Sequence, residues 1–518
     1  MNPTERSSPQ RLKLQAARTS LLHGPSGIDM LECVRSQGAL LLESNDHKNR
    51  RGRRTLLFPC PVVRLTFSGE QAVLQPLDPR GEAILLILAS RLPSEFQGRE
   101  CDGLLSLHIP KPDTSSALSD EQRFAAPNIL DVLRLLVSIP EDATPITDVP
   151  IALGGAFGYD LIDHFEELPP RPDGGPQDDL NLTLSLDGIV IDHQAQETTL
   201  VTRHLSDTQA DSRLLTALQA MTPNETKIPK ATQLPLFESD LSDDAFLAGV
   251  ESLLESIRCG DIFQGVLSRR LTISSDASTL NVYRALARDN PSPYQFHYDL
   301  GGDTLLGASP EAFVEVNDRQ ILLTPIAGTV PRGRLEDGTI DPEQDARAAV
   351  GLLLDAKEQA EHAMLIDLAR NDAARVCRPG SRTIESPFTI ERFSHVFHLV
   401  TQVRGELQDD LDALDAYRAT ANVGTLTGAP KLRATELLRE LEATGRGWYG
   451  GAVGFLTAGG DFTTCIVIRS LHEQDGQYTV RAGAGIVADS KPESELAETL
   501  HKMHAPLLAL SSAEGAIS

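Results

Sequence analysis

The chain has 518 residues, a formal net charge of -26 and an isoelectric point near 4.9. This length corresponds to about two to four domains, and 41% hydrophobic residues are enough to fill their cores. So acidic a chain is not expected to bind nucleic acid or an anionic membrane, because phosphate binding needs clustered lysine and arginine. An anionic small molecule requires a local cationic pocket, and a cation held by carboxylates would be a hard ion such as Mg²⁺.

The cysteines and the N-terminal sequence indicate a reducing compartment. The six cysteines form no C-x-x-C pair and have no histidine partner nearby, which argues against a disulfide framework or a zinc site. The N-terminal segment lacks the apolar core of a signal peptide, and no run of about 18 apolar residues occurs. We therefore expect a soluble cytoplasmic protein.

The first half of the chain alternates hairpin and helix signals. Strands are predicted where apolar residues alternate, helices where they follow the helical period, and loops where proline, glycine and polar residues gather. The expected elements, in order, are a strand at 39–44, a hairpin at 62–77 turning at Ser68-Gly69, a helix at 83–92, a loop at 111–123, a helix at 128–139, a loop at 168–180 and a hairpin at 188–205.

Residues 222–240 mark the clearest boundary. This segment is polar, contains three prolines and has no hydrophobic period. Ser242 and the two aspartates after it then predict a helix start, because they satisfy exposed N–H groups and the helix dipole, and Gly260 predicts its end. We therefore expect an N-terminal domain over 20–222 and a second domain over 240–510.

The second half also contains hairpins. One turns at Asn317-Asp318, and two more turn at residues 459–460 and 475–476. Short hairpins require antiparallel pairing, since a parallel crossover needs about a dozen residues or more. The expected fold class is therefore α+β, with antiparallel sheets packed by helices rather than a doubly wound parallel sheet.

Two pairs of glutamates, far apart in the chain, each stand three residues apart in a segment with helical character. They are Glu358 with Glu361, and Glu495 with Glu498. At this spacing both carboxylates of a pair project from one face of a helix. If the two helices face each other, four carboxylates converge, and they could not all remain ionised without a cation. Carboxylates plus retained waters suit Mg²⁺.

Two other interpretations of these pairs stay open. Each pair alone is also typical of a solvated helix face. A di-iron site would need a Glu-x-x-His pair on each of two helices. Glu498 and His501 supply one such pair, but no second copy lies beside Glu358, so di-iron is disfavoured.

Three glycine-containing segments could place backbone N–H groups against a ligand. Gly328 and Thr329 are predicted to lie in a turn after a strand, where N–H groups and a hydroxyl could hold a carboxylate; an ordinary tight turn has the same signature. Thr425 lies between glycines in a similar segment, and glycines in the strand at 481–487 indicate close approach of a ligand or another backbone. No P-loop motif occurs, so a phosphate cradle is disfavoured.

Three further side chains are candidates for binding or proton transfer. Arg469 ends an apolar strand, where it could bind a carboxylate through two hydrogen bonds or be a charge at a sheet edge. Tyr449 precedes a Gly-Gly pair and could donate from its phenol. His398 lies in an alternating segment; it fits a core position, and beside carboxylates it could move protons.

Taken in order, the motifs of the chain resemble those of a known family. The motifs are LLES, FGYD, NPSPY, GASPE, PIAGTVPRGR, DLARND, GTLTGAPK, YGGAVGF, CIVIRS and AGAGIVADS, and with the flanking helix they cover the chain from about residue 39 to about 505. The chain thereby resembles anthranilate synthase component I, within the chorismate-binding enzymes. The resemblance implies two packed, mainly antiparallel sheets flanked by helices, with an intimately associated N-terminal regulatory domain.

The resemblance also implies a reaction. Ammonia attacks C2 of chorismate while the C4 hydroxyl leaves, and the resulting 2-amino-2-deoxyisochorismate loses pyruvate to give anthranilate. This is the first committed step of tryptophan biosynthesis, or part of a secondary anthranilate pathway. Because chorismate is a dianion, the reaction would explain cationic and N–H-rich motifs in an acidic protein.

Site roles follow from the resemblance position by position. Glu361 and Glu498 would bind Mg²⁺ directly, and Glu358 and Glu495 through metal-bound water. Glu358 would also protonate the departing hydroxyl, a poor leaving group, and His398 would assist pyruvate elimination. The other expected site residues are Tyr449 and Arg469 at the enolpyruvyl carboxylate, Thr425 among the catalytic groups, and Gly328, Thr329, Gly483, Ala484, Gly485 and Lys502 lining the pocket.

Two positions separate this chain from relatives that use other nucleophiles. Relatives making 4-amino-4-deoxychorismate carry a nucleophilic lysine where this chain has Ala327, and relatives adding water carry a basic lysine where it has Gln264. Both differences favour ammonia at C2. A 2-amino-2-deoxyisochorismate synthase without pyruvate elimination is one alternative, and His398 argues against it. A non-catalytic sensor of chorismate or tryptophan is another, and the proton-transfer and metal-binding candidates argue against it: Glu358, Glu361, His398, Glu495 and Glu498.

A partner subunit is expected to supply ammonia. No cysteine lies in the G-x-C-x-G context of a glutamine amidotransferase nucleophile. We therefore expect a hetero-oligomer with a separate amidotransferase subunit, and an isolated chain that uses ammonium salts but not glutamine.

The resemblance places an inhibitory L-tryptophan site between the LLES turn and the NPSPY strand. Its expected residues are Glu43, Ser44, Pro293, Tyr294 and Gln295. Enteric members of the family read LLESA and PYMF, whereas this chain has Asn45 and Gln295. Methionine packs well against an indole, whereas a glutamine amide needs a polar partner, so feedback inhibition is expected to be weak or absent.

Overall fold

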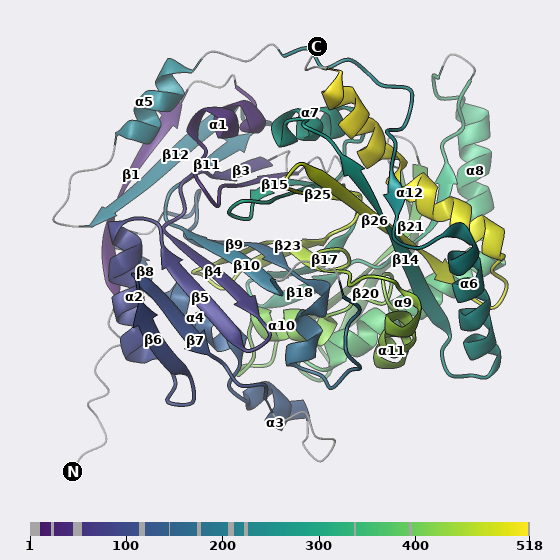
Figure 1. Ribbon diagram of the computed structural model, residues 1–518, viewed down its shortest axis with the longest axis horizontal. Coiled ribbons are helices and arrows are strands. Elements are labelled where there is room, and N and C mark those ends of the chain that lie inside the picture. The colour runs from purple at the N-terminus through teal and green to yellow at the C-terminus, as the bar shows by residue number, and fades with distance from the viewer. Residues whose placement is uncertain are drawn as a thin grey trace.

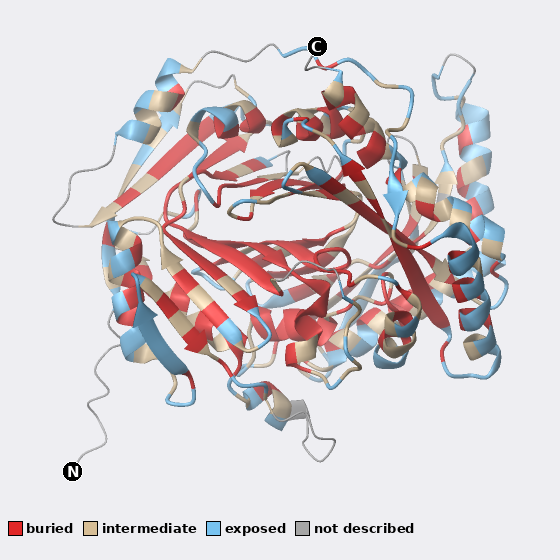
Figure 2. Cartoon of the chain, in the orientation of Figure 1, coloured by how far each residue is buried: buried red, intermediate tan, exposed pale blue. Residues whose placement is uncertain are grey.

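The computed structural model describes residues 11–21, 25–44, 54–112, 120–144, 146–173, 178–205, 212–221, 226–335, 338–392 and 396–515. Two large sheets, each of 13 strands in this part of the chain, lie in the middle of the molecule, and helices lie outside them (Figure 1). In Figure 2 the strands of the central region are largely buried, whereas α8 (Pro342–Leu354) is largely exposed.

The order of strands in each sheet is not the order in the sequence. The first sheet runs β13 (Glu238–Ser239), β14 (Gln264–Ser274), β26 (Gln477–Ile486), β25 (Ser470–Gln474), β16 (Thr304–Ser309), β15 (Tyr294–Asp299), β2 (Leu40–Glu43), β3 (Arg54–Phe58), β11 (Gly188–Asp192), β12 (Glu197–Leu205), β1 (Leu12–Leu21) and β8 (Pro140–Asp142), with β22 (Gly428–Ala429) paired to β14. The second sheet runs β19 (Ile326–Pro331), β21 (Val396–Glu406), β18 (Gln320–Leu323), β17 (Ala312–Asn317), β24 (Phe462–Ile466), β23 (Ala452–Thr457), β9 (Ala152–Phe157), β10 (Leu180–Ser185), β4 (Val63–Ser68), β5 (Gln71–Pro76), β7 (Leu104–His108) and β6 (Gln97–Cys101), with β20 (Thr383–Arg392) paired to β21.

The helices cover the outer faces of the two sheets. Besides α8 they are α1 (Gly27–Val34), α2 (Pro79–Arg91), α3 (Asp120–Ala125), α4 (Ile129–Ser138), the short 3₁₀ helix η1 (Tyr159–His164), α5 (Arg213–Ala220), α6 (Asp243–Arg258), α7 (Thr279–Asp289), α9 (Ala356–Ala374), α10 (Ala413–Thr420), α11 (Lys431–Leu441) and α12 (Pro492–Glu514). Leu31, Leu286 and Leu507 from α1, α7 and α12 join the apolar core of the first sheet. Leu88 and Leu133 from α2 and α4 join that of the second.

A separate apolar cluster joins the inner faces of the sheets. Leu40 and Phe296 from the first sheet share it with Ala156 and Val453 from the second. Strands in the middle of the molecule are therefore buried on both faces, as in β9 and β10, where every residue is buried. Neighbouring strands pair antiparallel, and among the described strands the pair of β1 and β8 is parallel. The expected α+β class with two packed, mainly antiparallel sheets is confirmed.

Local sequence signals account for most element boundaries. The Ser242 side chain accepts a hydrogen bond from Ala245 at the start of α6, and Gly260 ends that helix in a left-handed conformation, with φ +81°. The hairpins predicted at 62–77 and 188–205 correspond to β4–β5 and β11–β12. The predicted helices at 83–92 and 128–139 correspond to α2 and α4.

Three local expectations were wrong. Residues 120–123, the end of the predicted loop, belong to α3, because Glu, Gln and Arg favour a helix despite their polarity. The hairpin turn after β17 lies at Asp318 and Arg319, both with positive φ, one residue later than predicted. Gly328 lies within β19 rather than in a turn; pairing of β19 with β21 shifts register between Ala327 and Val330.

Strands from both halves of the chain share each sheet. Strand β2 pairs with β15 in the first sheet, and β9 pairs with β23 in the second. Residues 226–237 form no helix or strand. The predicted N-terminal segment therefore adds its strands to sheets that the C-terminal segment also builds. None of the described helices is both long and apolar enough to cross a membrane.

Candidate active site

The two glutamate pairs lie on helices that approach each other. Asp355 caps α9 by accepting hydrogen bonds from the backbone of residues 357 and 358, and Pro492 begins α12. The pKa of Glu361 is raised, first by burial and then by the charges of Glu358 and Glu498. Burial and the charges of Asp355 and Glu498 likewise raise the pKa of Glu358. Carboxylates from distant parts of the chain therefore repel one another across a shared space.

Glu495 belongs to the same group. Its side chain is buried, and burial is the first cause of its raised pKa, followed by the charge of Glu498. A hydrogen bond with Ser490 opposes this shift. The solvated-face interpretation does not fit Glu495, because a solvated carboxylate would keep its ordinary pKa.

The carboxylates suit an ion that keeps most of its water ligands better than an ion bound by protein ligands alone. Among the described residues, no three His, Cys, Asp or Glu side chains are gathered closely enough to hold a metal ion together. Glu498 instead forms an ion pair of 2.6 Å with Lys502. Mg²⁺ needs only one or two protein carboxylates, because waters and substrate oxygens complete its coordination shell. A di-iron centre, which needs a full set of carboxylates and histidines, does not fit.

Cationic and phenolic groups lie next to the glutamates. The Lys502 ammonium donates to the Gly483 carbonyl at 2.9 Å, and Arg469 donates to the Lys502 carbonyl at 3.1 Å. Burial lowers the pKa of Arg469. The charges of Tyr449, Glu498 and Glu311 oppose that shift. Burial also raises the pKa of Tyr449 to about 12, so its phenol remains a donor. These groups can bind a carboxylate.

Arg469 lies in the link between β24 and β25. Strand β24 ends at Ile466, two residues before the end of the apolar run, so Arg469 does not end a strand as predicted. Its backbone has a φ of +53°, a conformation that costs energy for a residue with a side chain. Strain of this kind is typical of functional positions.

The glycines of β26 allow the neighbouring strand β14 to approach closely. A Cβ at Gly483 would lie 2.9 Å from the Leu267 carbonyl oxygen of β14, and a Cβ at Gly485 would lie 3.0 Å from the Gln264 amide nitrogen. The Ala484 side chain points the other way, into an apolar cluster with Phe246. Only the backbone of Ala484 can therefore contact a ligand.

Gly328 brings strand β19 against helix α9. Its φ is +61°, and a Cβ there would lie 2.9 Å from a carboxylate oxygen of Glu358, so only glycine fits. His398 Nδ1 lies 2.8 Å from the Gly328 carbonyl, which requires a proton on Nδ1 and makes Nε2 the basic ring nitrogen. Burial lowers the pKa of His398. The backbone of Thr329 lies in β19; its side chain is outside the described residues.

Sequence reasoning missed Glu311, which lies between β16 and β17. Thr425 Oγ1 donates to Glu311 at 3.1 Å. Burial raises the pKa of Glu311 to about 8, although Thr425, Lys502 and Arg469 lower it. A narrow cavity of about 50 Å³ extends from this carboxyl to Asp372. The signal that could have found Glu311 is an acidic residue in a two-residue link between two buried strands.

The residues predicted to bind tryptophan also come together, at the junction of β2 and β15. Glu43 and Gln295 are paired in register. The Tyr283 hydroxyl donates to Glu43 at 2.6 Å and the Thr55 hydroxyl at 3.1 Å. Ser44 follows β2 and Pro293 precedes β15; Tyr294 donates to Glu315 at 2.9 Å. Asn45 lies outside the described residues.

This fold and this site define a class of enzyme. The chain belongs to the chorismate-binding enzyme family, whose sequence model matches residues 98–508. It is 40% identical over 515 residues to anthranilate synthase component 1 of Salmonella typhimurium, covering 98% of each chain. It is also 40% identical over 503 residues to the pyocyanine-specific anthranilate synthase component 1 of Pseudomonas aeruginosa, covering 94% of this chain and 93% of that one.

A solved structure of a similar protein has the same fold. The crystal structure of anthranilate synthase component I from Streptococcus pneumoniae superposes with a TM-score of 0.71 at 29% sequence identity, over 88% of this chain and 92% of that one. Two isochorismate synthases, from Bacillus anthracis and Escherichia coli, share the fold at 21% and 16% identity.

Proposed function

We propose that this chain is the chorismate-converting component of an anthranilate synthase. The observation that carries the proposal is the meeting of two glutamate pairs beside the Lys502 and Arg469 cations. That arrangement suits a dianion held partly through a divalent ion and partly through cationic side chains. Relatives of the same name, 40% identical over nearly the whole chain, support it.

Glu361 and Glu498 would hold Mg²⁺, with Glu358 and Glu495 acting through its waters. When bound, Mg²⁺ neutralises the ring carboxylate of the substrate and the repulsion among the glutamates. The raised pKa values of Glu358, Glu361 and Glu495 support this assignment, because burial and the charge of Glu498 disfavour their ionised forms and a bound cation would offset both.

Arg469, Tyr449 and Lys502 would orient the enolpyruvyl carboxylate. Tyr449 is buried and Arg469 is half-buried, and donors shielded from water bind an anion more strongly than exposed ones because water does not compete. The backbone around Gly328, Gly483, Ala484 and Gly485 would line the ring without intruding on it.

The first half-reaction needs an acid. Attack of ammonia at C2 shifts both ring double bonds and expels the C4 hydroxyl; the nitrogen gives up a proton, and the hydroxyl must take up a proton to leave as water. Glu358 has a raised pKa and suits this role. Glu311 is a second candidate favoured by its own observation: with a pKa of about 8 it keeps its proton at neutral pH, and Thr425 fixes its orientation.

The second half-reaction needs a base. Removal of the C2 proton forms the aromatic ring and breaks the C3–O bond, and the enolpyruvate released takes up a proton to become pyruvate. Nε2 of His398 would accept the C2 proton, because the Gly328 carbonyl holds the ring with its proton on Nδ1. A synthase that stops at 2-amino-2-deoxyisochorismate would have no use for this base.

Product analysis tests the proposal. The chain is incubated with chorismate, Mg²⁺ and ammonium, and anthranilate and pyruvate are measured together. We expect equal amounts of both. An amino-substituted product without pyruvate would establish the shorter synthase, and the absence of any turnover would favour a sensor.

Ammonia would reach the chain from a separate glutamine amidotransferase subunit, in a hetero-oligomer. The purified chain is expected to turn over with ammonium and not with glutamine. Turnover with glutamine by the chain alone would contradict the assignment.

L-Tryptophan would bind at the junction of β2 and β15. Gln295 is buried there beside Glu43, where an apolar residue would suit an indole better. We expect weak feedback or none, which would fit a secondary pathway; inhibition at micromolar tryptophan would contradict this. Identity does not decide the pathway, since the Salmonella and the pyocyanine-specific relatives are equally similar.

A further inference from the structure

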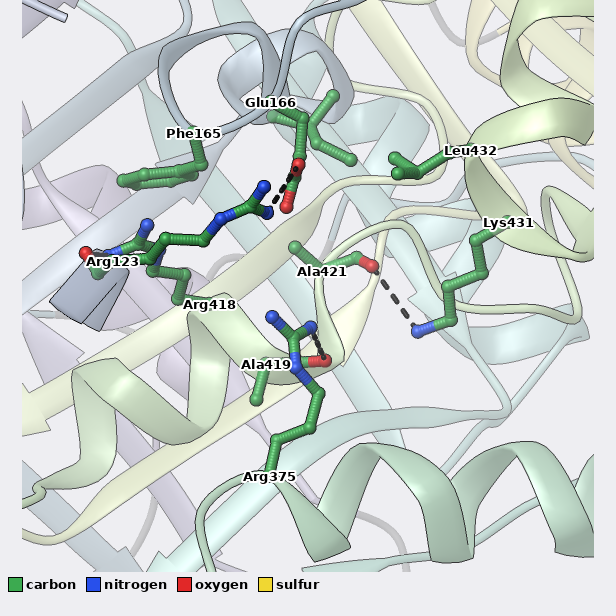
Figure 3. Close-up of a pocket in the computed structure, with 10 residues that line it drawn as sticks. Arg123, Phe165, Glu166, Arg375, Arg418, Ala419, Ala421, Lys431 and Leu432 are labelled. Carbon is green, nitrogen blue, oxygen red and sulfur yellow. Dashed lines mark hydrogen bonds and ion pairs between the residues drawn. The ribbon is translucent and has the colours of Figure 1, made fainter. Parts of the chain in front are cut away.

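A second, cationic cavity lies outside the proposed catalytic site. Its volume is about 230 Å³, and α3, η1, the end of α9, the end of α10 and the start of α11 enclose it (Figure 3). Its charged lining consists of Arg123, Arg375, Arg418, Lys431 and Glu166. Four cations against one carboxylate leave an excess of positive charge in a chain whose net charge is -26.

Hydrogen bonds and ion pairs hold these cations in place, and the lining itself contributes a single carboxylate, that of Glu166. Arg375 donates to the Ala419 carbonyl at 3.5 Å, and Arg418 donates to the Arg123 carbonyl at 2.8 Å. A carbonyl oxygen satisfies a donor but carries no net charge. Arg123 pairs with Glu166 at 3.5 Å, a long contact. Arg418 is buried, and burial lowers its pKa. The charges of Glu166 and Asp415 oppose this shift, whereas the like charges of Arg375 and Arg123 add to it.

The walls favour a small organic anion. Helix α11 begins at the cavity with Lys431, and no side chain caps its first N–H groups. A helix N-terminus beside a lysine attracts negative charge. Phe165, Leu432 and Ile162 form apolar walls. The volume accommodates only a ligand of few atoms.

Lys431 connects this cavity to the catalytic site. Its ammonium pairs with Asp372 at 2.7 Å and also donates to the Thr420 carbonyl at 3.3 Å. Lys431 lines the cationic cavity, whereas Asp372 lines the narrow cavity that contains Glu311. Burial raises the pKa of Asp372, so this carboxylate depends on Lys431 for its charge balance.

We propose that the cationic cavity binds a small dianion, a dicarboxylate or a phosphate, and that the bound dianion competes with Asp372 for the Lys431 ammonium. The proposal rests on the lining and the shared ion pair, and it does not depend on the reaction assigned to the chain.

Calorimetric titration of the full-length chain tests the proposal. The probes are malonate and inorganic phosphate at constant ionic strength without Mg²⁺, with acetate as the monovalent control. We expect saturable binding of one dianion per chain and much weaker binding of acetate. The tighter of the two probes identifies carboxylate or phosphate chemistry; binding no tighter than that of acetate would overturn the proposal.

Three variants locate the site. Arg123→Gln should weaken binding about fivefold and its matched partner Glu166→Gln should tighten it about fivefold, because each changes one charge at a partly buried site. Asp372→Asn should tighten binding by a similar factor by releasing Lys431. An anion bound at the catalytic site would be insensitive to Arg123→Gln and Glu166→Gln, and that result would overturn the assignment. Unchanged affinity in Asp372→Asn would overturn the competition for Lys431. Circular dichroism confirms that each variant is folded.

Discussion

Two regions with half-buried carboxylates differ in how the charge of those carboxylates is met. At the junction of β2 and β15, burial raises the pKa of Glu43, and hydrogen bonds from Tyr283 and Thr55 oppose that shift. Between α9 and α12, Glu361 and Glu358 face the like charge of Glu498. The first group is part of the structure, whereas the second is stable only at the cost of repulsion. The like charge between α9 and α12 therefore supports the proposed cation site there.

The largest effect is expected from a substitution among the glutamates that lie between α9 and α12. Glu361→Gln should lower kcat/KM by about 10³-fold, because it removes a direct ligand of the ion that stabilises the transition state. The fold should be unharmed, and the variant should gain a few tenths of a kcal/mol in unfolding free energy without Mg²⁺, since a like-charge contact is lost. Initial rates and thermal denaturation measure both effects.

Glu343→Gln is the matched control for this prediction. Glu343 is an exposed glutamate on α8 that pairs with Arg347, away from both glutamate pairs. Its substitution should leave rate and Mg²⁺ dependence unchanged. A Glu361→Gln variant as active as this control would remove the basis for the cation site.

His398→Asn should separate the two half-reactions. We expect pyruvate release to slow by about 10²- to 10⁴-fold, the range of general base catalysis, while 2-amino-2-deoxyisochorismate accumulates. Chromatography of quenched reactions measures both products. His472→Asn, which changes a histidine bonded to Asp303, is the control. Equal loss of both steps would contradict a role confined to elimination.

The pH profile distinguishes the two candidate acids. A carboxyl with a pKa of about 8 is protonated below that pH, so its action as an acid should be lost as pH rises through about 8. Glu311→Gln should lower activity by about 10²-fold and remove this alkaline limb, whereas Glu358→Gln should keep it. An alkaline limb that persists in Glu311→Gln would assign the acid to another group.

Glu311 also makes stability depend on pH in a defined direction. Its folded-state pKa of about 8 lies above the ordinary value of 4.5, so the folded protein binds the extra proton between these values. The free energy of unfolding should therefore be highest below pH 4.5 as far as this group is concerned, and should fall as pH rises toward about 8. Denaturant titrations at several pH values give the free energy of unfolding of wild type and of Glu311→Gln. This free energy should change less with pH in the variant.

The smallest effect is expected at Glu43, whose carboxylate accepts two side-chain hydrogen bonds. Glu43→Gln replaces one acceptor with an NH₂ group that faces a donor from Tyr283 or Thr55, so unfolding free energy should fall by about 1–2 kcal/mol. Ammonium-dependent turnover should be unchanged. A large loss of activity without loss of stability would show that the two groups of carboxylates are coupled.

Local structure was predictable from local chemistry. The Ser242 cap, the glycine after α6 and the alternation in the hairpins decide element boundaries within a few residues of chain. The spacing of Glu358 with Glu361 predicted a common helix face because the helical period fixes that geometry. Polar helix formers at 120–123 were predicted as a loop, since polarity and helix propensity conflict there.

Long-range structure was less accessible. Nothing within β2 or β9 specifies that these strands pair with β15 and β23, because strand partners are selected by packing across the whole chain. Glu311 was missed for the same reason: its raised pKa arises from burial that only the assembled sheets provide. The role of Gly328 likewise depends on the approach of Glu358 from another element.

A Mg²⁺ titration of the initial rate tests the central claim most directly. Anthranilate fluorescence is followed with chorismate and ammonium, for wild type and for Glu361→Gln, from chelated metal to excess. We expect no turnover in chelator and a saturable rise in wild type, with Glu361→Gln needing far more Mg²⁺ or not responding. Full-rate turnover of wild type in the presence of chelator would contradict the claim that the facing glutamates act through a divalent cation.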